Sequence, residues 1–267
     1  MRENNTKKDA TKETILIGPD CIEFGWKMMF QGAARKAARD YKNVIVVCEP
    51  GFSIFYKDFA DKIIEQEYKC ALRDRYLYKA TYPKVSGLIK NLYPGASSFS
   101  PNKKTCKPNG EFIQFGTFKE SLAYDIVLHA RAEDRYKSKK RNWKPSLYEK
   151  LVKHGKRVCS IGSKLSAAYI KGTDDLRGVP LETLCNVMAS SQVGVGTSSG
   201  PMHLMSMCGL PHIVMSGSES HKSIGYRTNK ERYKKFWNPL KTKCAVIDEF
   251  GWTPPVKEVE KVLKRYL

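Results

Sequence analysis

The residues best suited to chemistry in this sequence form a polar turn, Thr197-Ser198-Ser199-Gly200. The apolar run Val193–Gly196 predicts a buried parallel strand before the turn, and Met202–Cys208 predicts a short helix after it, with Pro201 at the first helical position. The start of such a helix presents unpaired N–H groups and the positive end of a dipole, which bind anions such as phosphate. The turn therefore predicts a phosphate site; the alternative is an ordinary connection between a strand and a helix.

Basic side chains could serve the same anion from a second loop. The run Asp125–His129 predicts a strand, and the loop after it carries six basic residues, Arg131, Arg135, Lys137, Lys139, Lys140 and Arg141. Because the carboxyl ends of parallel strands meet at one edge of a sheet, this loop is expected to face the same ligand as the turn. Six basic residues cannot all be ligands. We select Arg131 and Arg141, since a guanidinium group is always charged and can bind phosphate bidentately.

An acidic candidate lies in the loop after the first predicted strand, Thr14–Gly18. Glu23 stands between apolar Ile22 and Phe24, just before a helical pattern. Partial burial would raise the pKa of its carboxyl group and let it act as a base near neutrality. The alternative is a carboxylate that complements the dipole of the following helix.

The wider stretch Asp174–Met215 resembles the nucleotide-sugar-binding half of heptosyltransferase-like glycosyltransferases. The residues that carry the resemblance are Gly178-Val179-Pro180-Leu181-Glu182-Thr183-Leu184, Met188-Ala189-Ser190-Ser191 and Val195–Leu204. In that family a similar helix leads to a strand and a D-S/T-G-P-x-H-L-A turn, which holds the pyrophosphate of the donor. This sequence has Ser198 in place of the aspartate and Met205 in place of the small residue. The turn therefore lacks a carboxylate, and Met205 is expected to change how closely the helix packs.

The resemblance implies a fold and a reaction. The fold would be α/β and GT-B-like, with two Rossmann-like parallel-sheet units facing a cleft. The reaction would be the transfer of a sugar from a nucleotide diphosphate donor to a glycan acceptor hydroxyl, with inversion. In the family the loop after the first strand supplies an acidic catalytic base, and Glu23 or Asp20 fits that place; we select Glu23. His203 would lie beside the pyrophosphate, and Glu182 near the nucleoside. The complete predicted donor site is Arg131, Arg141, Glu182, Ser198, Ser199, Gly200, Pro201 and His203.

A metal ion or other cofactor is not expected. The sequence contains no apparent D-x-D metal pair, and fixed positive groups can take the place of a cation at a diphosphate. The nucleotide sugar would be a co-substrate rather than a resident cofactor.

The hydrophobic pattern predicts alternating strands and helices that would position these residues. Predicted strands are Thr14–Gly18, Asn43–Cys48, Glu111–Gly116, Asp125–His129, Arg157–Gly162, Val193–Gly196 and His212–Met215. Predicted helices are Trp26–Tyr41, Phe55–Glu65, Lys84–Leu92, Pro145–His154, Leu181–Ser190, Met202–Cys208 and Val256–Tyr266, and predicted loops are Gly95–Gly110 and Gly172–Pro180. We expect a lead-in without order over 1–12, an acceptor-side domain over 13–122, a nucleotide-sugar-binding domain over 123–252 and a terminal helix within 253–267.

The charge of the chain favours a polyanionic partner. Its 267 residues carry a formal net charge of +20, spread along the sequence. An anionic glycan or glycolipid acceptor, a nucleotide diphosphate, an anionic membrane surface and nucleic acid would each match this charge. A solvated basic surface without a specific partner is the alternative. Nucleic-acid binding without catalysis therefore stays open. Nucleotide-sugar epimerisation or hydrolysis stays open as well, because such an enzyme could share the fold.

Composition also bounds the compartment. No apolar stretch approaches the roughly 18–20 residues of a membrane span, and Met1–Lys12 has no apolar core, unlike a secretory signal. The eight cysteines are scattered singly without a CxxC pair, which is typical of reduced core residues. A cytoplasmic protein is expected, with peripheral contact to a membrane surface as an option.

Overall fold

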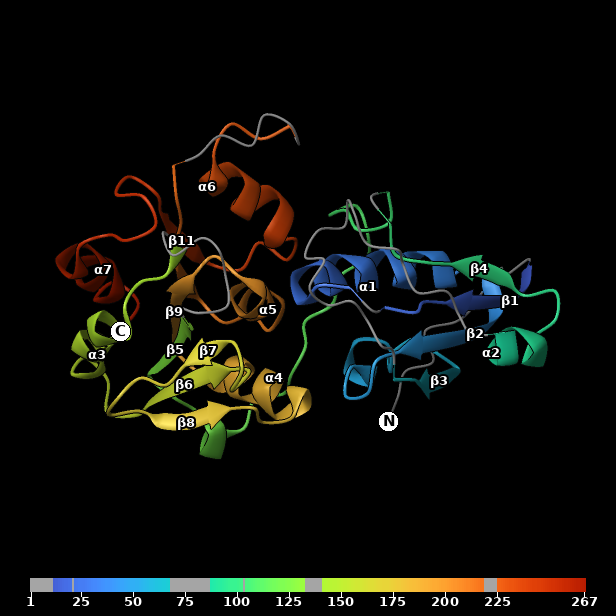
Figure 1. Cartoon of the computed structure of the whole chain (residues 1–267), viewed down its shortest axis with the longest axis horizontal. Coiled ribbons are helices and arrows are strands. Elements are labelled where there is room, and N and C mark those ends of the chain that lie inside the picture. Colours follow the sequence, from blue (N-terminus) through green and yellow to red (C-terminus); the bar gives the residue numbers. More distant parts are fainter. Residues whose placement is uncertain (1–11, 21, 68–86, 103, 133–140, 219–224) are drawn as a thin grey trace. The chain divides into compact units, whose positions relative to one another are not determined.

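The computed structural model describes residues 12–20, 22–67, 87–102, 104–132, 141–218 and 225–267. The chain divides into two compact units, Met1–Phe112 and Ile113–Leu267, each built on a parallel sheet (Figure 1). This arrangement confirms the α/β class and the two Rossmann-like units. Most of the expected lead-in, residues 1–11, lies outside the described part. None of the helices in the described part combines the length and the hydropathy of a membrane span.

The chain passes from the first unit to the second after Phe112, earlier than the boundary expected at Leu122. The backbone N–H of Glu111 donates to the carbonyl of Gly32, at 2.8 Å, in the first unit. The N–H of Phe115 donates to the carbonyl of Met207, at 2.9 Å, in the second. The stretch that follows contains a single 3₁₀ turn, η2 (Glu120–Leu122), before the first strand of the second unit.

The first unit is a four-stranded parallel sheet in the order β3-β2-β1-β4. Its elements are β1 (Lys12–Ile17), α1 (Phe24–Ala38), β2 (Tyr41–Cys48), η1 (Ser53–Phe55), β3 (Lys62–Glu65), α2 (Gly87–Leu92) and β4 (Ser97–Phe99). Strand β2 is buried over most of its length and β1 over its second half, and Met28, Met29 and Phe30 on α1 are fully buried. These residues have the apolar runs and helical spacing that the sequence analysis used, so this part of the prediction is confirmed.

The second unit has six parallel strands in the order β11-β10-β9-β5-β6-β8, and the short β7 pairs antiparallel with β5 (Figure 1). Its strands are β5 (Ile126–Arg131), β6 (Val158–Gly162), β7 (Ala167–Ala168), β8 (Asp174–Arg177), β9 (Val193–Thr197), β10 (His212–Met215) and β11 (Cys244–Ile247). Its helices are α3 (Pro145–Val152), α4 (Leu181–Ser190), α5 (Gly200–Met207), α6 (Asn229–Arg232) with the π-helical turn η6 (Tyr233–Trp237), and α7 (Val256–Leu263).

The terminal helix α7 belongs to the core of the second unit. Val259 and Leu263 are fully buried in the same apolar cluster as Leu128 of β5 and Val195 of β9. The six cysteines in the described part are free, and five of them are buried, in agreement with reduced core residues.

Several expected elements are wrong, and all but one of these errors involve a short edge strand. Phe55–Glu65 is not a helix, since it ends in strand β3, and Glu111–Gly116 forms no strand. The predicted loops Gly95–Gly110 and Gly172–Pro180 contain strands β4 and β8. The three strands misread or missed in these stretches lie at sheet edges, and their short sequences, KIIE, SSF and DDLR, lack the buried apolar run of a central strand.

Strand β9 and helix α5 pack through glycines that face methionines. A Cβ atom on Gly194 would lie 2.3 Å from the sulfur of Met205, and one on Gly196 would lie 2.6 Å from the sulfur of Met202. The bulky Met205, which departs from the family pattern, therefore packs against a strand position without a side chain. This contact places the N-terminus of α5 directly beyond the end of β9.

Candidate functional site at the strand-order reversal of the second unit

The predicted turn lies where the strand order of the second unit reverses. Numbered along the chain without β7, the six parallel strands follow the order 3-2-1-4-5-6, which is the Rossmann order. The reversal falls between β5 and β9, the place where open α/β sheets bind ligands beyond the carboxyl ends of their strands. Arg131 ends β5, Thr197 ends β9, and Ser198-Ser199-Gly200 leads into α5.

The N-terminus of α5 has no side-chain cap. Ser199 occupies the cap position with extended backbone, and Pro201 lies in the first turn, as predicted. The hydroxyl group of Ser199 is hydrogen-bonded instead to Nδ1 of His129, at 3.1 Å. Ser198, Ser199, Gly200 and Pro201 are all half-buried. The helix therefore begins at the sheet edge with its dipole directed beyond the strands, which is the geometry of an anion site.

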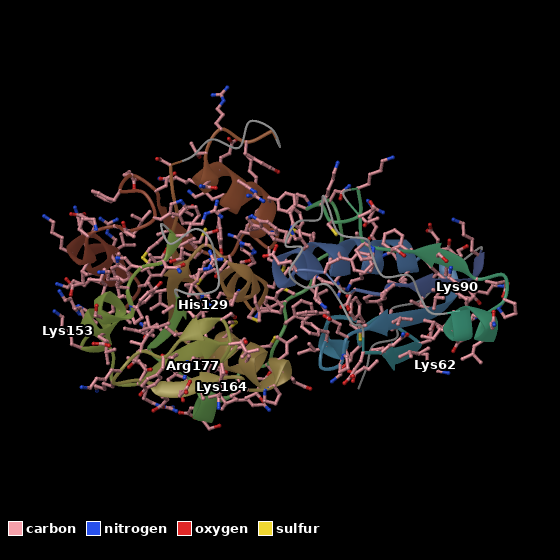
Figure 2. All side chains as sticks on the ribbon, viewed as in Figure 1. Lys62, Lys90, His129, Lys153, Lys164 and Arg177 are labelled. Atoms are coloured by element: carbon pink, nitrogen blue, oxygen red, sulfur yellow. The ribbon has the colours of Figure 1, made fainter. Side chains whose placement is uncertain are left out.

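His129 is a site residue that the sequence analysis used only as the end of a strand. It lies on β5 (Figure 2), is 4% exposed and pairs in register with Gly196 of β9. Burial, together with the charge of Arg131, lowers the pKa of its imidazole to about 3. The ring is therefore neutral at physiological pH. A histidine at the carboxyl end of a strand was the available signal.

The two selected arginines have different surroundings. Arg131 is half-buried at the end of β5, and β5 pairs with β9, whose carboxyl end leads into α5; its charge also lowers the pKa of both His129 and His203. Arg141 is exposed, and its guanidinium carbon lies 4.6 Å from the centre of the Trp252 ring. The four basic residues between them lie outside the described part of the chain. Arg131 is thus the better placed of the two for an anion at α5.

His203 lies in the first turn of α5 but is packed inside the protein. Its ring stacks on Trp237 with 4.1 Å between centroids and 3° between planes, and neither ring nitrogen has a hydrogen-bond partner among the described residues. Burial, with the nearby charge of Arg232, holds its pKa well below the usual value. The structure thus favours a packing role for this side chain over a hydrogen bond to the pyrophosphate.

Glu182 lies on a different element from the turn. It is exposed in the first turn of α4, after β8, where its carboxylate complements the helix dipole. Strand β8 is at the far end of the sheet order from the reversal between β5 and β9. The place of Glu182 near a nucleoside therefore stays a prediction.

The first unit has a reversal of its own, and a buried ion cluster occupies it. The order β3-β2-β1-β4 changes direction between β1 and β4, beside the loop that begins at Gly18. Gly18 has a φ of 108°, and a Cβ there would lie 2.2 Å from the carbonyl oxygen of Val47, so only glycine fits. The N–H of Gly18 donates to the carbonyl of Phe99, and its own carbonyl accepts from the hydroxyl of Ser100.

Asp20 is fully buried in this loop and has several partners. Its carboxylate accepts from Tyr56 Oη at 2.8 Å, from the backbone N–H of Glu49 at 3.0 Å and from Lys27 Nζ at 3.3 Å. Lys27, on α1, is 2% exposed and also pairs with the carboxylate of Glu49. The sequence analysis missed Lys27, because a lysine in a helix reads as a surface residue.

Glu23 differs from Asp20 in its exposure to solvent. It is exposed at the cap position of α1, so the partial burial expected for it is wrong. Its side chain makes no capping hydrogen bond to α1.

Within the described residues, no cluster of three or more His, Cys, Asp or Glu side chains could hold a metal ion.

Solved structures with the same architecture are glycosyltransferases. Heptosyltransferase II of E. coli, described as an ADP-heptose LPS enzyme, is 15% identical, with a TM-score of 0.59 over 95% of this chain and 99% of that one. E. coli heptosyltransferase WaaC, solved with ADP, is 11% identical, with a TM-score of 0.55 over 96% of this chain and 100% of that one. The chain has the heptosyltransferase fold.

A glycosyltransferase family 9 protein from Veillonella parvula shares the heptosyltransferase fold with it, at 12% identity and a TM-score of 0.53 over 98% of this chain and 91% of that one. The sequence itself matches no family model and no curated protein. The fold expected from the resemblance is therefore confirmed by structure, at identities where sequence alone gives no match.

Proposed function

We propose that the protein is a glycosyltransferase that moves a sugar from a nucleoside diphosphate donor to an acceptor hydroxyl. The observation that carries the proposal is the uncapped N-terminus of α5, beside Arg131 and at the strand-order reversal of a heptosyltransferase fold. A diphosphate is the leaving group of such a reaction and needs positive charge as it departs. The solved relatives are described with ADP or ADP-heptose, which supports a nucleotide-sugar donor.

In the proposed reaction Glu23 takes the proton from the acceptor hydroxyl. The acceptor oxygen forms a bond to the anomeric carbon, and the bond from that carbon to the diphosphate oxygen breaks, leaving a nucleoside diphosphate. A single displacement of this kind inverts the anomeric centre. The exposure of Glu23 favours it as the base over Asp20, whose carboxylate is buried and engaged by Lys27 and Tyr56.

The developing charge on the diphosphate would be stabilised by Arg131 and by the N-terminus of α5. Fixed groups of this kind are preorganised and need no metal ion, so we propose metal independence. Arg141, Ser198, Ser199, Gly200 and Pro201 complete the proposed donor site, while Glu182 would contact the nucleoside. The net charge of +20 favours an anionic glycan or glycolipid as acceptor.

Binding of nucleoside diphosphates tests the donor site. Purified protein in EDTA is titrated calorimetrically with ADP, UDP, GDP and CDP, and with their sugar conjugates. We expect the nucleotides of one nucleobase to bind. Arg131→Gln should weaken that binding about tenfold or more, and Lys153→Gln should leave it unchanged. Lys153 is an exposed residue of the same unit, so its variant removes an equal charge. No binding by any nucleotide would overturn the proposal.

Turnover tests the base and the stereochemistry. With the nucleotide sugar that binds and an anionic glycan pool as acceptor, Glu23→Gln is expected to lower kcat by about 10²-fold or more while leaving nucleotide affinity within twofold. NMR of the product should show the anomeric configuration opposite to that of the donor. Sugar-nucleotide breakdown without acceptor would favour a hydrolase or epimerase instead. Tight RNA or DNA binding, with no nucleotide binding, would favour a nucleic-acid-binding protein.

A further inference from the structure

One polar contact in the second unit is not what the local sequence leads us to expect. Serine at a helix cap position normally accepts a hydrogen bond from a backbone N–H of the first turn. This chain has such a cap at α6, where the hydroxyl of Thr228 accepts from the N–H of Glu231 at 3.0 Å. At α5 the hydroxyl of Ser199 is held by His129 instead, and the helix starts without a cap.

Glycines on the two strands next to β5 make room for His129. A Cβ atom on Gly162, at the end of β6, would lie 3.1 Å from Cδ2 and 3.3 Å from Nε2 of the ring. A Cβ atom on Gly196, on β9, would lie 2.9 Å from the carbonyl oxygen and 3.3 Å from Cβ of His129. Glycines on both neighbouring strands thus leave the space that this residue fills.

The tautomer of the His129 ring decides whether the Ser199 hydroxyl can donate its proton to a ligand. A neutral imidazole has one N–H group, on Nδ1 or on Nε2. If Nδ1 carries it, His129 donates to Ser199 Oγ, and the serine proton is free to donate elsewhere. If Nε2 carries it, the serine proton is used on Nδ1 and only lone pairs face the ligand. An anion at α5 therefore selects the Nδ1–H form, since lone pairs repel negative charge.

We propose that His129 is a positioning residue which, through Nδ1–H, holds the Ser199 hydroxyl off the helix and directs its proton to the diphosphate of the donor. This inference rests on the proposed function and deepens it. His129 itself touches no substrate; it leaves the first-turn N–H groups of α5 uncapped and adds the hydroxyl of Ser199 as one more donor. The ligand class is a pyrophosphate group, whatever the base or the sugar.

Inorganic pyrophosphate is the probe, because it is common to all nucleoside diphosphates. Calorimetric affinities are compared for the full-length protein and for Ser199→Ala, His129→Leu, His129→Asn and the double variant His129→Leu with Ser199→Ala. We expect Ser199→Ala and His129→Leu each to weaken binding about tenfold. The double variant should be no weaker than either single one, because the two residues act as one unit. His129→Asn, whose amide can donate in place of Nδ1–H, should stay within about threefold of wild type.

A second measurement is independent of folding defects in the leucine variant. Nitrogen chemical shifts of the His129 ring should show Nδ1 protonated in the wild-type protein saturated with pyrophosphate. An Nε2–H ring in that complex, an unchanged affinity of Ser199→Ala, or additive losses in the double variant would each overturn the positioning role. Failure of the wild-type protein to bind pyrophosphate would instead refute the donor site, which distinguishes the two proposals.

Discussion

At the scale of single residues, the first unit depends on the ammonium group of Lys27, which lies inside the protein between Asp20 and Glu49. Replacing Lys27 with Met would leave the buried carboxylate of Asp20 without its cation. Removing one partner of a buried pair costs about 3–5 kcal/mol, because the remaining charge stays desolvated. We therefore expect Lys27→Met to lower the free energy of unfolding by that amount in urea.

The control is Lys42→Met in the same unit. Lys42 pairs with Glu13 at 2.6 Å, but both side chains are more than half exposed. An exposed pair contributes at most about 1 kcal/mol. Equal losses in the two variants would mean that the Asp20 cluster does not hold the loop that carries Glu23.

Histidines of the second unit make its stability depend on pH. Burial lowers the pKa of His212 to about 4, while an unfolded histidine titrates near 6.5. Below pH 6.5 the unfolded chain therefore gains a proton that folded His212 does not accept, and the free energy of unfolding falls by up to about 1.4 kcal/mol per pH unit for this group. The stability that neutral His212 contributes is fully present above pH 6.5 and is lost as the pH falls toward 4.

Urea unfolding of the wild type and of His212→Gln at pH 7, 6 and 5 measures this contribution. The glutamine variant does not titrate, so its loss of stability between pH 6 and pH 5 should be smaller than that of the wild type by about 1 kcal/mol. Parallel pH dependences of the two proteins would contradict the assignment.

At the scale of elements, the packing of α5 on β9 sets the position of the proposed donor site. A Cβ on Gly196 would meet the carbonyl oxygen of His129 at 2.9 Å, and this backbone atom cannot move away cheaply. We expect Gly196→Ala to lower the free energy of unfolding by about 1–3 kcal/mol. Nucleotide affinity should fall as well, because β9 is pushed away from both α5 and β5.

Gly87→Ala is the matched control for this substitution. Among the described residues, no atom lies within 4 Å of a Cβ added at Gly87, and Gly87 does not have a positive φ, so the change should be nearly neutral. Urea unfolding and calorimetric titration of both variants decide the matter. A Gly196→Ala protein as stable as Gly87→Ala would show that β9 and α5 can separate without cost.

The same elements show what the sequence could predict. Leu181–Ser190 and His212–Met215 are found at their predicted ends, because a buried apolar face and flanking Pro or Gly residues define them locally. Edge strands such as β8 escape prediction, since pairing rather than burial creates them. The turn at Ser199 was predictable in place and in geometry. The bond from Ser199 to His129 was not, because it joins residues that only the sheet order brings together.

At the scale of the whole molecule, the two parallel sheets have the same topology over their first four strands, in the order 3-2-1-4. Each places a loop at the reversal of strand order, and the two loops have opposite chemistry. The second unit offers Arg131 and the positive end of α5, while the first offers Glu23 in the loop that also carries Asp20 of the buried Asp20–Lys27–Glu49 ion cluster. Under the proposed function, the first loop would supply the proton acceptor and the second would bind the leaving anion, which are the two requirements of glycosyl transfer.

The net charge of +20 makes a separate prediction about polyanions. A diphosphate at α5 involves few charges, so its affinity should change little with salt. A single-stranded RNA bound across a basic surface should show a log–log salt slope of about −0.7 for each phosphate contacted. Titrations with a twenty-nucleotide RNA and with the preferred nucleoside diphosphate, between 50 and 300 mM salt, compare the two. We expect the RNA to dissociate at high salt while the nucleotide stays bound, and Arg131→Gln to weaken the nucleotide far more than the RNA. If Arg131→Gln weakened both equally, the polyanion would occupy the α5 site, and the charge of the chain would be part of that site rather than of a general basic surface.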